Sequence, residues 1–405
     1  MRICLVSHEY PPETGGGGIG TYLLQIGSLL CSAGHAVEVF AGTAGPDTTT
    51  VTAGGPVLHR VSAADSPGFR VSVLPAFAAA HSARPFDVVE GTDFDASALE
   101  IKRRFPGLPC VVKLHTPRFL IDEMHSRLPT TAQRIRILAG ALRRGRFPRE
   151  VPIRSRPEAQ AEIAAVAESD EIAAPSRAIG AAATTWATLD PARISVFPYP
   201  YVPSPELLAI PAGTSTNRIT FIGRIELRKG VIDLADAIAE VHRSSPGVRF
   251  RFVGREMPSP VAGVGMRAFL ERRLVGLRNL VEFTGPVPPE ELARILSETD
   301  VVAAPSHWES FGLVCCEALA AARGVVASAN GGMAEILVGG RCGILVPPRQ
   351  PGSLAAALIR LLKTPALRQT LGEAGRRHVL EAYGAETVLA AQIASYRRAI
   401  ARCPA

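Results

Sequence analysis

The sequence predicts an α/β protein of two domains, each built around a mostly parallel sheet. Short apolar runs rich in β-branched residues alternate with longer stretches rich in alanine and leucine, which is typical of βαβ units. This alternation stops at a proline-rich stretch, 198–205, and begins again near residue 219. A chain of 405 residues is long enough to bury two cores of this kind.

The first half contains the apolar runs expected of a Rossmann-like domain over residues 1–200. The first helix is expected over residues 20–33. Strands are expected at Ile3–Val6, Val37–Phe40, Val71–Leu74, Val88–Val89, Val111–Leu114, Glu171–Ala173 and Ile194–Phe197.

The second half repeats the pattern and predicts a second Rossmann-like domain over residues 206–380. Strands are expected at Ile219–Ile222, Phe250–Val253, Val281–Phe283 and Val301–Val302, with helices at 231–243, through Leu270 and at 289–297. The segment 385–401 has the pattern of an amphipathic helix, which can cross back to the first domain. We therefore expect two Rossmann-like domains that face each other across a cleft.

Composition predicts an ordinary soluble protein. Hydrophobic residues make up 47% and charged residues 20% of the chain, and no apolar run approaches the roughly 20 residues that span a bilayer. Met1 and Arg2 lead straight into an apolar strand without the features of a signal peptide, so we expect a cytoplasmic location. The seven cysteines show no C-x-x-C spacing, which favours free thiols over disulfides or a zinc site.

The net charge of +7 comes from one segment. Nine arginines lie between Arg127 and Arg156 against the single acid Glu150, so this segment alone carries +8. We interpret it first as a solvated basic face, and second as a contact for an anionic acceptor or for the surface of a membrane to which the protein binds peripherally. Nucleic acid is not an expected partner, because the segment has almost no aromatic residues on which bases could stack.

The stretch 11–22, PPETGGGGIGTY, matches the G-x-G-x-x-G fingerprint of dinucleotide-binding proteins. That fingerprint needs a strand that ends almost at the first glycine, whereas a loop with two prolines intervenes here. No acidic residue follows the second strand to hold a ribose, and Thr21 stands where a P-loop has its lysine. Neither NAD nor a P-loop nucleotide is therefore expected, and the glycines need another role.

A second glycine turn, Gly223–Gly230, follows the first strand of the second domain. Arg224 and Lys229 bracket the start of the next helix in this turn. Backbone N–H groups at a helix N-terminus favour an anion, and each cation can add a charge-assisted hydrogen bond of about 1.5–3 kcal/mol. The turn suits a phosphate group.

Two glutamates eight positions apart follow the predicted strand at residue 301. Glu309 lies in a strand-to-helix loop, Ser310 is expected to cap the helix, and Glu317 lies within the helix. A loop carboxylate can meet a sugar, the N–H groups of residues 311–313 can bind its hydroxyls or a phosphate, and the helical carboxylate can accept both ribose hydroxyls. An unpaired carboxylate beside the apolar stretch 318–322 is costly, which favours a functional role.

Together these motifs resemble the retaining nucleotide-sugar glycosyltransferases of the GT-B fold, glycosyltransferase family 4. The resemblance spans nearly the whole chain. It rests on motifs that occur in order: Gly17–Tyr22, Gly34–His35, Gly223–Gly230, Phe252–Gly254, Val281–Gly285, Glu309–Glu317 and Gly331–Ile336.

The resemblance implies a donor-binding site and a role for each of its parts. Arg224 and Lys229 are expected to hold the diphosphate, Glu317 the ribose, and Glu309 with the backbone after it the transferred sugar. The glycine loop within the stretch 11–22 is expected to bring backbone N–H groups of the first domain near the donor phosphate. The expected donor-binding residues are Gly17, Gly18, Arg224, Lys229, Val287 in the base pocket, Glu309, Ser310, Phe311, Gly312, Leu313 and Glu317.

His115 follows a first-domain strand at its carboxyl end, where open α/β sheets place ligands. Its default interpretation is structural, but a histidine at this place meets the donor sugar in the family that the chain resembles. We therefore expect it to act in catalysis with Glu309, Arg224 and Lys229. Nearby, Asp93 and Asp95 are interpreted as structural or acceptor-facing and not as metal ligands.

The implied activity is transfer of a sugar from a nucleoside diphosphate, with uridine the commonest base in the family, to a hydroxyl acceptor with retention. Neither a metal nor another cofactor is expected, because the two cations and the helix N-termini can stabilise the diphosphate that leaves. The acceptor would belong to glycan, lipid-linked saccharide or glycoconjugate synthesis. The alternatives are an epimerase or phosphorylase of the same fold, and a non-catalytic module that binds sugar nucleotides or nucleic acid.

Overall fold

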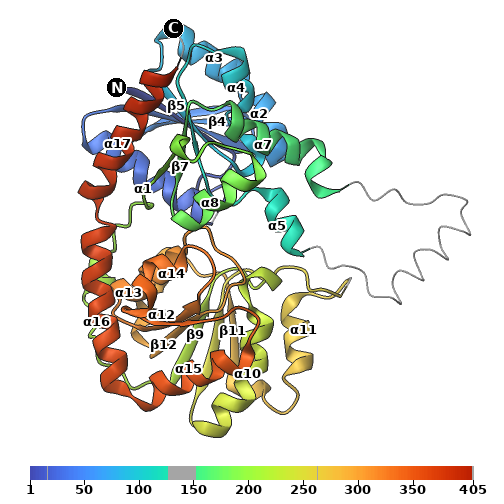
Figure 1. Ribbon diagram of the computed structural model, residues 1–405, viewed down its shortest axis with the longest axis vertical. Coiled ribbons are helices and arrows are strands. Elements are labelled where there is room, and N and C mark those ends of the chain that lie inside the picture. The colour runs from blue at the N-terminus through green and yellow to red at the C-terminus, as the bar shows by residue number, and fades with distance from the viewer. Residues whose placement is uncertain (16, 126–151, 262, 404–405) are drawn as a thin grey trace, which may run out of the picture.

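The computed structural model describes the chain except residues 16, 126–151, 262 and 404–405. Two sheets lie one above the other along the long axis of the molecule, each flanked by helices (Figure 1). The strand order is β3-β4-β2-β1-β5-β6-β7-β8 in the first sheet and β11-β10-β9-β12-β13-β14 in the second. Within the described residues every pair of neighbouring strands is parallel except β3 and β4.

The first domain alternates strands and helices as far as the proline-rich stretch 198–205, which is the linker between the domains. Its strands are β1 (Arg2–Ser7), β2 (Ala36–Thr43), β3 (Thr48–Val51), β4 (Val57–Ser62), β5 (Val88–Thr92), β6 (Cys110–Lys113), β7 (Glu171–Ala174) and β8 (Ile194–Val196). Its helices are α1 (Gly18–Ser32), α2 (Ser66–Ser72), α3 (Leu74–Ala83), α4 (Leu99–Arg104), α5 (Arg118–His125), α7 (Pro157–Glu168) and α8 (Arg177–Trp186), with short 3-10 turns η1 (Phe94–Ala96), η2 (Ile153–Ser155) and η3 (Pro191–Arg193).

The second domain follows the same plan after a short helix, α9 (Pro205–Leu208). Its strands are β9 (Arg218–Ile222), β10 (Arg249–Val253), β11 (Val281–Gly285), β12 (Val301–Ala304), β13 (Gly324–Ser328) and β14 (Ile344–Val346). Its helices are α10 (Val231–Ser244), α11 (Met266–Arg273), α12 (Leu292–Ser297), α13 (Leu313–Ala320), α14 (Met333–Ile336) and α15 (Pro351–Lys363), with 3-10 turns η4 (Leu227–Lys229), η5 (Arg278–Leu280), η6 (Pro289–Glu291) and η7 (Val338–Gly340).

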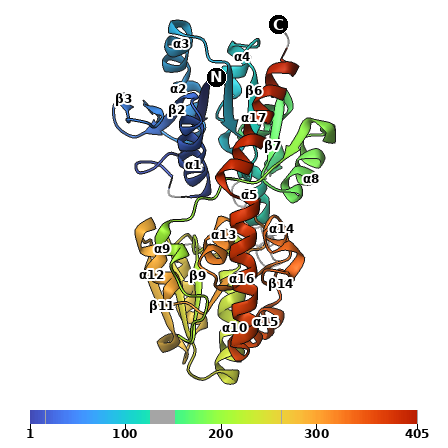
Figure 2. The same cartoon turned by 90° about the vertical axis from the view of Figure 1, so that its left-hand side faces the viewer.

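The last two helices connect the domains. Helix α16 (Pro365–Ala382) packs against α13 and β13 of the second domain, whereas α17 (Ala385–Arg402) packs against α1 and strands β5, β6 and β7 of the first. Figure 2 shows the two helices running one after the other along the side of the molecule. The chain therefore ends on the domain in which it begins.

The strand predicted at Val71–Leu74 is wrong, because these residues belong to α2, α3 and the junction between them. Phe69, Val73 and Phe77 are fully buried at a spacing of four residues, which is the period of a helix face. The strand in this part of the sheet is β4 instead, paired with β3, whose four residues are all exposed. An exposed edge strand has no apolar alternation by which the sequence could have revealed it.

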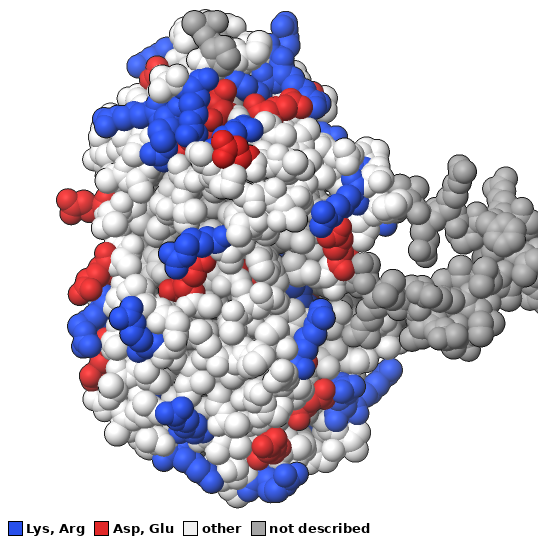
Figure 3. Space-filling view, viewed as in Figure 1, with Lys and Arg blue, Asp and Glu red and all other residues white. Residues whose placement is uncertain are grey.

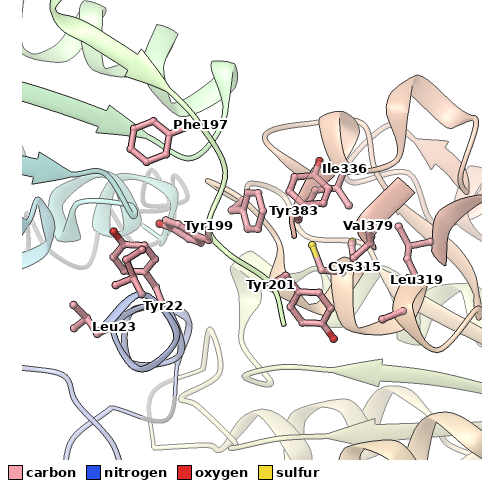
Figure 4. Close-up of a cluster of buried hydrophobic side chains, with 14 of the residues drawn as sticks. Tyr22, Leu23, Phe197, Tyr199, Tyr201, Cys315, Leu319, Ile336, Val379 and Tyr383 are labelled. Carbon is pink, nitrogen blue, oxygen red and sulfur yellow. The ribbon is translucent and has the colours of Figure 1, made fainter. Parts of the chain in front are cut away.

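The two tyrosines of the linker between the domains, residues 198–205, are buried. Tyr199 and Tyr201 keep 3% and 4% of their surface exposed, whereas Val202 beside them keeps 51%. Both belong to a hydrophobic core that includes residues of both domains (Figure 4). The backbone N–H of Tyr201 also donates to the carbonyl of Tyr383 at the end of α16, at 2.9 Å.

On the face shown in Figure 3, basic side chains lie beside acidic ones. Most of the basic segment Arg127–Arg156 falls outside the described residues. Of its members that are described, Arg154 pairs with Glu123 at 2.6 Å and Arg156 lies 3.9 Å from Asp122. Within the part of the chain that the structure covers, no helix combines the length and apolarity that a membrane span needs.

A buried polar cluster ties α17 to the first sheet. The carboxylate of Glu90 on β5 accepts hydrogen bonds from Tyr22 at 2.7 Å, Gln392 at 2.7 Å and Tyr396 at 3.0 Å. The ammonium of Lys113 is fully buried beside this carboxylate. Burial lowers the pKa of Lys113 to about 7, and the charge of Glu90 opposes that shift.

Replacing Glu90 with alanine is expected to lower the free energy of unfolding by about 3–5 kcal/mol, because it leaves three buried donors without this acceptor and the buried ammonium of Lys113 without its counter-charge. Urea denaturation at neutral pH measures the change. The control is Glu158→Ala on the exposed first turn of α7, which should cost less than about 1 kcal/mol. Equal losses in the two variants would contradict the role assigned to the cluster.

Candidate functional site

The candidate site begins at the loop after β9, which a glycine brings against the loop after β12. Gly230 has φ +68°, and a Cβ there would lie 2.0 Å from the carbonyl oxygen of Pro305. Only glycine allows this approach. As a result, Lys229 from the first loop reaches Glu309 in the second.

The carboxylate of Glu309 is held by cations inside the protein. It forms a partly buried ion pair with the ammonium of Lys229, accepts a hydrogen bond from the Ser306 hydroxyl at 3.0 Å, and lies 3.5 Å from the guanidinium of Arg228. Burial alone would raise the pKa of Glu309, but Lys229 and Arg228 outweigh burial and hold it at about 2. This carboxylate is therefore ionised at any physiological pH.

The backbone of Glu309 is positioned by the Gly331–Gly332 pair. The N–H of Gly332 donates to the carbonyl of Glu309 at 2.8 Å, and a Cβ on Gly331 would lie 2.2 Å from that same oxygen. Gly331 also has φ +88°. The glycine motif that follows β13 thus supports the loop that carries the carboxylate.

Helix α13 begins at Leu313, and its N-cap is Gly312 with φ +111°. The expectation that Ser310 caps this helix is therefore wrong. A Cβ on residue 312 would lie 2.6 Å from Met333, so the chain turns into the helix where a side chain has no room. The carbonyl of Ser310 instead accepts a hydrogen bond at 2.6 Å from the hydroxyl of Ser176 in the first domain.

Glu317 lies in α13 and is partly exposed, while its neighbours on the helix are buried. Its carboxylate makes no hydrogen bond or ion pair with another described residue. Burial raises its pKa to about 7, and the charge of Lys229 opposes that shift. The ammonium of Lys229 therefore acts on both carboxylates of the predicted pair.

Arg224 is about half exposed, and its guanidinium lies 3.4 Å from the carboxylate of Glu226. Its charge also reaches the first domain: burial raises the pKa of Glu9, and Arg224 opposes this shift. Since Glu9 lies in the loop after β1, directly before the glycine loop, Arg224 faces that loop.

The glycine loop itself contacts the second domain. Gly17 is the N-cap of α1, and a Cβ on Gly18 would lie 3.8 Å from a methyl carbon of Leu313. The N-termini of α1 and α13 therefore meet at this point. The structure thus brings Gly18 and Leu313 together, and Lys229 acts on both Glu309 and Glu317. Val287 lies farther along the same sheet edge, partly exposed between β11 and η6.

His115 lies at the carboxyl end of β6 and is 6% exposed. Its backbone N–H donates to Asp93 at 2.8 Å, and its Nδ1 lies 2.6 Å from the hydroxyl of Tyr199. The Nε2 atom is buried and has no hydrogen-bond partner among the described residues. Burial lowers the pKa of His115 to about 3, and the nearby charge of Lys113 adds to the effect, so the imidazole is neutral at physiological pH.

The aspartates near His115 have protein partners. Asp93 is fully buried and accepts the N–H groups of His115 and Phe94, and Asp95 forms a bidentate pair with Arg118 at 2.7 Å. The described residues include no group of three or more His, Cys, Asp or Glu side chains that could hold a metal ion.

Sequence reasoning missed the contacts that join the domains beside the site. The carboxylate of Glu335 on α14 accepts the N–H groups of Arg177 and Ala178 at the N-terminus of α8, at 3.1 and 3.0 Å. Glu335 belongs to the motif 331–336, but its partners lie 157 or more positions away, so no local pattern could reveal them. Tyr199 and His115 are likewise 84 positions apart in the sequence, so no local pattern could reveal their contact.

A cavity of about 300 Å³ lies between the domains next to this site. Residues 307 and 308, which directly precede Glu309, form part of its wall. It is lined by Leu120, Met124 and Ala182 from the first domain and by His307, Trp308, Asn330, Pro348 and Arg349 from the second.

Comparison with known proteins places both domains in described families. Residues 17–200 match the family "Glycosyl transferase 4-like domain", and residues 216–364 match the family "Glycosyl transferases group 1". The D-inositol 3-phosphate glycosyltransferase of Kineococcus radiotolerans is 30% identical to the chain, over 99% of the chain and 96% of the relative.

Two solved structures share the fold at low sequence identity. The sucrose-phosphate synthase of Thermosynechococcus elongatus superposes with a TM-score of 0.76 at 22% identity, covering 99% of each chain. Anabaena HepE, solved in complex with UDP-glucose, superposes with a TM-score of 0.65 at 18% identity, covering 98% of this chain and 100% of the other.

The two glutamates are expected to respond oppositely to pH. Glu317 has a raised pKa, so its ionisation weakens the fold as pH rises from about 4.5 to about 7; Glu317→Gln should match the natural protein near pH 4.5 and be more stable by about 3 kcal/mol at pH 8. Glu309 has a lowered pKa, so its contribution is complete above about pH 4.5 and is lost only as pH falls towards 2. Glu309→Gln should therefore be less stable, by about 3 kcal/mol, throughout pH 5–8.

Urea denaturation of the natural protein and both variants across pH 5–8 tests these signs. A Glu317→Gln effect that does not change with pH, or a Glu309→Gln variant as stable as the natural protein, would contradict the assignment.

Proposed function

The chain belongs to the group 1 glycosyltransferases, and on that premise we propose that it transfers a sugar from a UDP-sugar to a hydroxyl acceptor, with retention and without a metal ion. The membership also confirms the predicted resemblance to glycosyltransferase family 4. The GT-B fold is confirmed as well, since two parallel-sheet α/β domains align over almost their full length with solved enzymes of that fold.

The observation that carries the proposal is the position of Lys229 relative to the two glutamates. Its ammonium pairs with Glu309. Its charge also opposes the rise in pKa that burial causes at Glu317. In a sugar nucleotide the diphosphate joins the transferred sugar to the ribose. A cation that acts on both a sugar-binding and a ribose-binding carboxylate fits that order of groups.

Each part of the site then has a chemical role. Glu317 accepts the ribose hydroxyls, Lys229 and Arg224 bind the diphosphate, and Glu309 accepts hydrogen bonds from hydroxyls of the transferred sugar. The N–H groups at the start of α13, residues 311–313, add partial positive charge where the leaving diphosphate develops negative charge. Val287 borders the base.

The first domain completes the site. The glycine loop meets α13 through Gly18 and Leu313, so its N–H groups lie on the opposite side of the diphosphate. His115 contacts the transferred sugar through its unpartnered Nε2. Because this atom and Glu309 are buried, the domains must part to admit the donor and close again to exclude water.

Uridine is the proposed base for two reasons. It is the commonest base in the family that the sequence resembles, and Anabaena HepE, with the same fold, was solved with UDP-glucose. The cations and the helix N-termini supply the charge that a metal would otherwise provide, which supports transfer without one. The acceptor is proposed only as a hydroxyl compound that approaches from the first domain.

The donor is identified by a thermal-shift screen against UDP-, GDP-, ADP- and TDP-sugars. A UDP-sugar at about 100 times its dissociation constant should stabilise the protein by about 2.7 kcal/mol. Glu317→Ala should abolish the shift, whereas Glu240→Ala, on the exposed side of α10, should leave it unchanged. No shift with any sugar nucleotide would refute the donor site.

Transfer itself is tested with the radiolabelled donor from that screen and pools of hydroxyl acceptors. We expect label to move to an acceptor at a rate that EDTA changes less than twofold, and proton NMR of the product to give the anomeric configuration of the donor. Epimerised donor without transfer would instead favour an epimerase. A rate that EDTA abolishes and Mg²⁺ or Mn²⁺ restores would refute metal independence.

A further inference from the structure

The hydroxyl of Tyr199 has two hydrogen-bond partners among the described residues. It donates to the carbonyl oxygen of Leu114 at 2.8 Å and lies 2.6 Å from Nδ1 of His115. Burial raises the pKa of this hydroxyl well above its ordinary value. The group is therefore a neutral phenol.

A count of protons fixes the direction of these hydrogen bonds. A phenol has one proton to donate, and a carbonyl oxygen can only accept. If the Tyr199 proton points to Leu114, the hydrogen bond at 2.6 Å requires that Nδ1 of His115 carries a proton and donates it to the phenol oxygen. The opposite direction would leave two oxygen atoms 2.8 Å apart without a proton between them.

This choice decides the chemistry of the other ring nitrogen. A neutral imidazole has one proton, so a proton on Nδ1 leaves Nε2 with a free lone pair. Nε2 is buried and has no partner among the described residues. A buried acceptor without a partner is costly, and a hydroxyl of a bound ligand would satisfy it.

We propose that Tyr199 is a positioning residue that holds His115 in the Nδ1–H tautomer, so that Nε2 accepts a hydrogen bond from a hydroxyl of the donor sugar. This deepens the proposed function and rests on it for the identity of the ligand. The assignment of the tautomer stands on the free protein alone.

The tyrosine ring is held from both domains. It packs against Tyr22 of α1 at 4.8 Å between ring centroids and against Phe311, which directly precedes the N-cap of α13, at 4.9 Å. Figure 4 shows Tyr199 between Tyr22 and Tyr383, with the hydroxyl of Tyr201 pointing away from it. The second domain therefore helps to fix the phenol that orients the histidine of the first.

The test is ¹⁵N NMR of the full chain labelled at histidine, without ligand, with the His115 signals assigned from a His115→Gln spectrum. In the natural protein Nε2 should resonate as an unprotonated nitrogen and Nδ1 as a protonated one. In Tyr199→Phe the ring packing is kept but the acceptor of the Nδ1 proton is lost, so the signals should move towards the other tautomer.

Tyr201→Phe is the matched control, because Tyr201 lies two residues along the same linker and its buried hydroxyl has no partner among the described residues. It should leave the His115 signals unchanged. A protonated Nε2 in the natural protein overturns the proposal whether or not any variant folds. So does a Tyr199→Phe spectrum identical to that of the natural protein.

A second readout uses turnover with the donor found by the thermal-shift screen. Tyr199→Phe should lower kcat by about tenfold, the loss of roughly one hydrogen bond in the reacting state, with the donor KM changed less than twofold. Unchanged kcat would overturn the catalytic part of the proposal. Absence of any sugar-nucleotide binding in the natural protein would instead refute the proposed function and leave the NMR result intact.

Discussion

The site depends on one partly buried cation that acts on two carboxylates. Lys229 pairs with Glu309 and reaches Glu317 by charge, and this arrangement exists because the loops after β9 and β12 touch. That contact in turn requires glycine at position 230, where any side chain would collide with the carbonyl of Pro305. A backbone constraint thus sets the electrostatics of the site.

The same cation leaves the two glutamates in different states. Lys229 and Arg228 compensate fully for the burial of Glu309, whose pKa falls to about 2, whereas Glu317 has no partner among the described residues and its pKa rises to about 7. Glu309 is thereby a fixed anion that belongs to the folded structure. Glu317 is instead held in an unfavourable charged state, which hydrogen bonds from the ribose of the proposed donor would relieve.

Local sequence patterns were sufficient for most of the fold and for the family. Apolar runs marked most of the buried parallel strands, because such strands have no exposed face. The parallel strands β4, β13 and β14 were not predicted, and β3 has no buried face by which a pattern could reveal it. Spacing within single loops was sufficient to single out Arg224, Lys229 and both glutamates. It could not reveal that Ser310 accepts from Ser176 or that Glu335 binds the start of α8, because these contacts join segments more than 130 positions apart.

The linker shows most clearly what a local pattern leaves out. Prolines between residues 198 and 205 break regular structure, and a segment without regular structure is usually solvated. Here its tyrosines fill the core that the domains share, and Tyr199 contacts His115 of the first domain through its hydroxyl and Phe311 of the second through its ring. Any movement that parts the domains must therefore disturb the surroundings of His115. In the proposed function, the opening that admits a donor and the proton arrangement of His115 would therefore both depend on one contact.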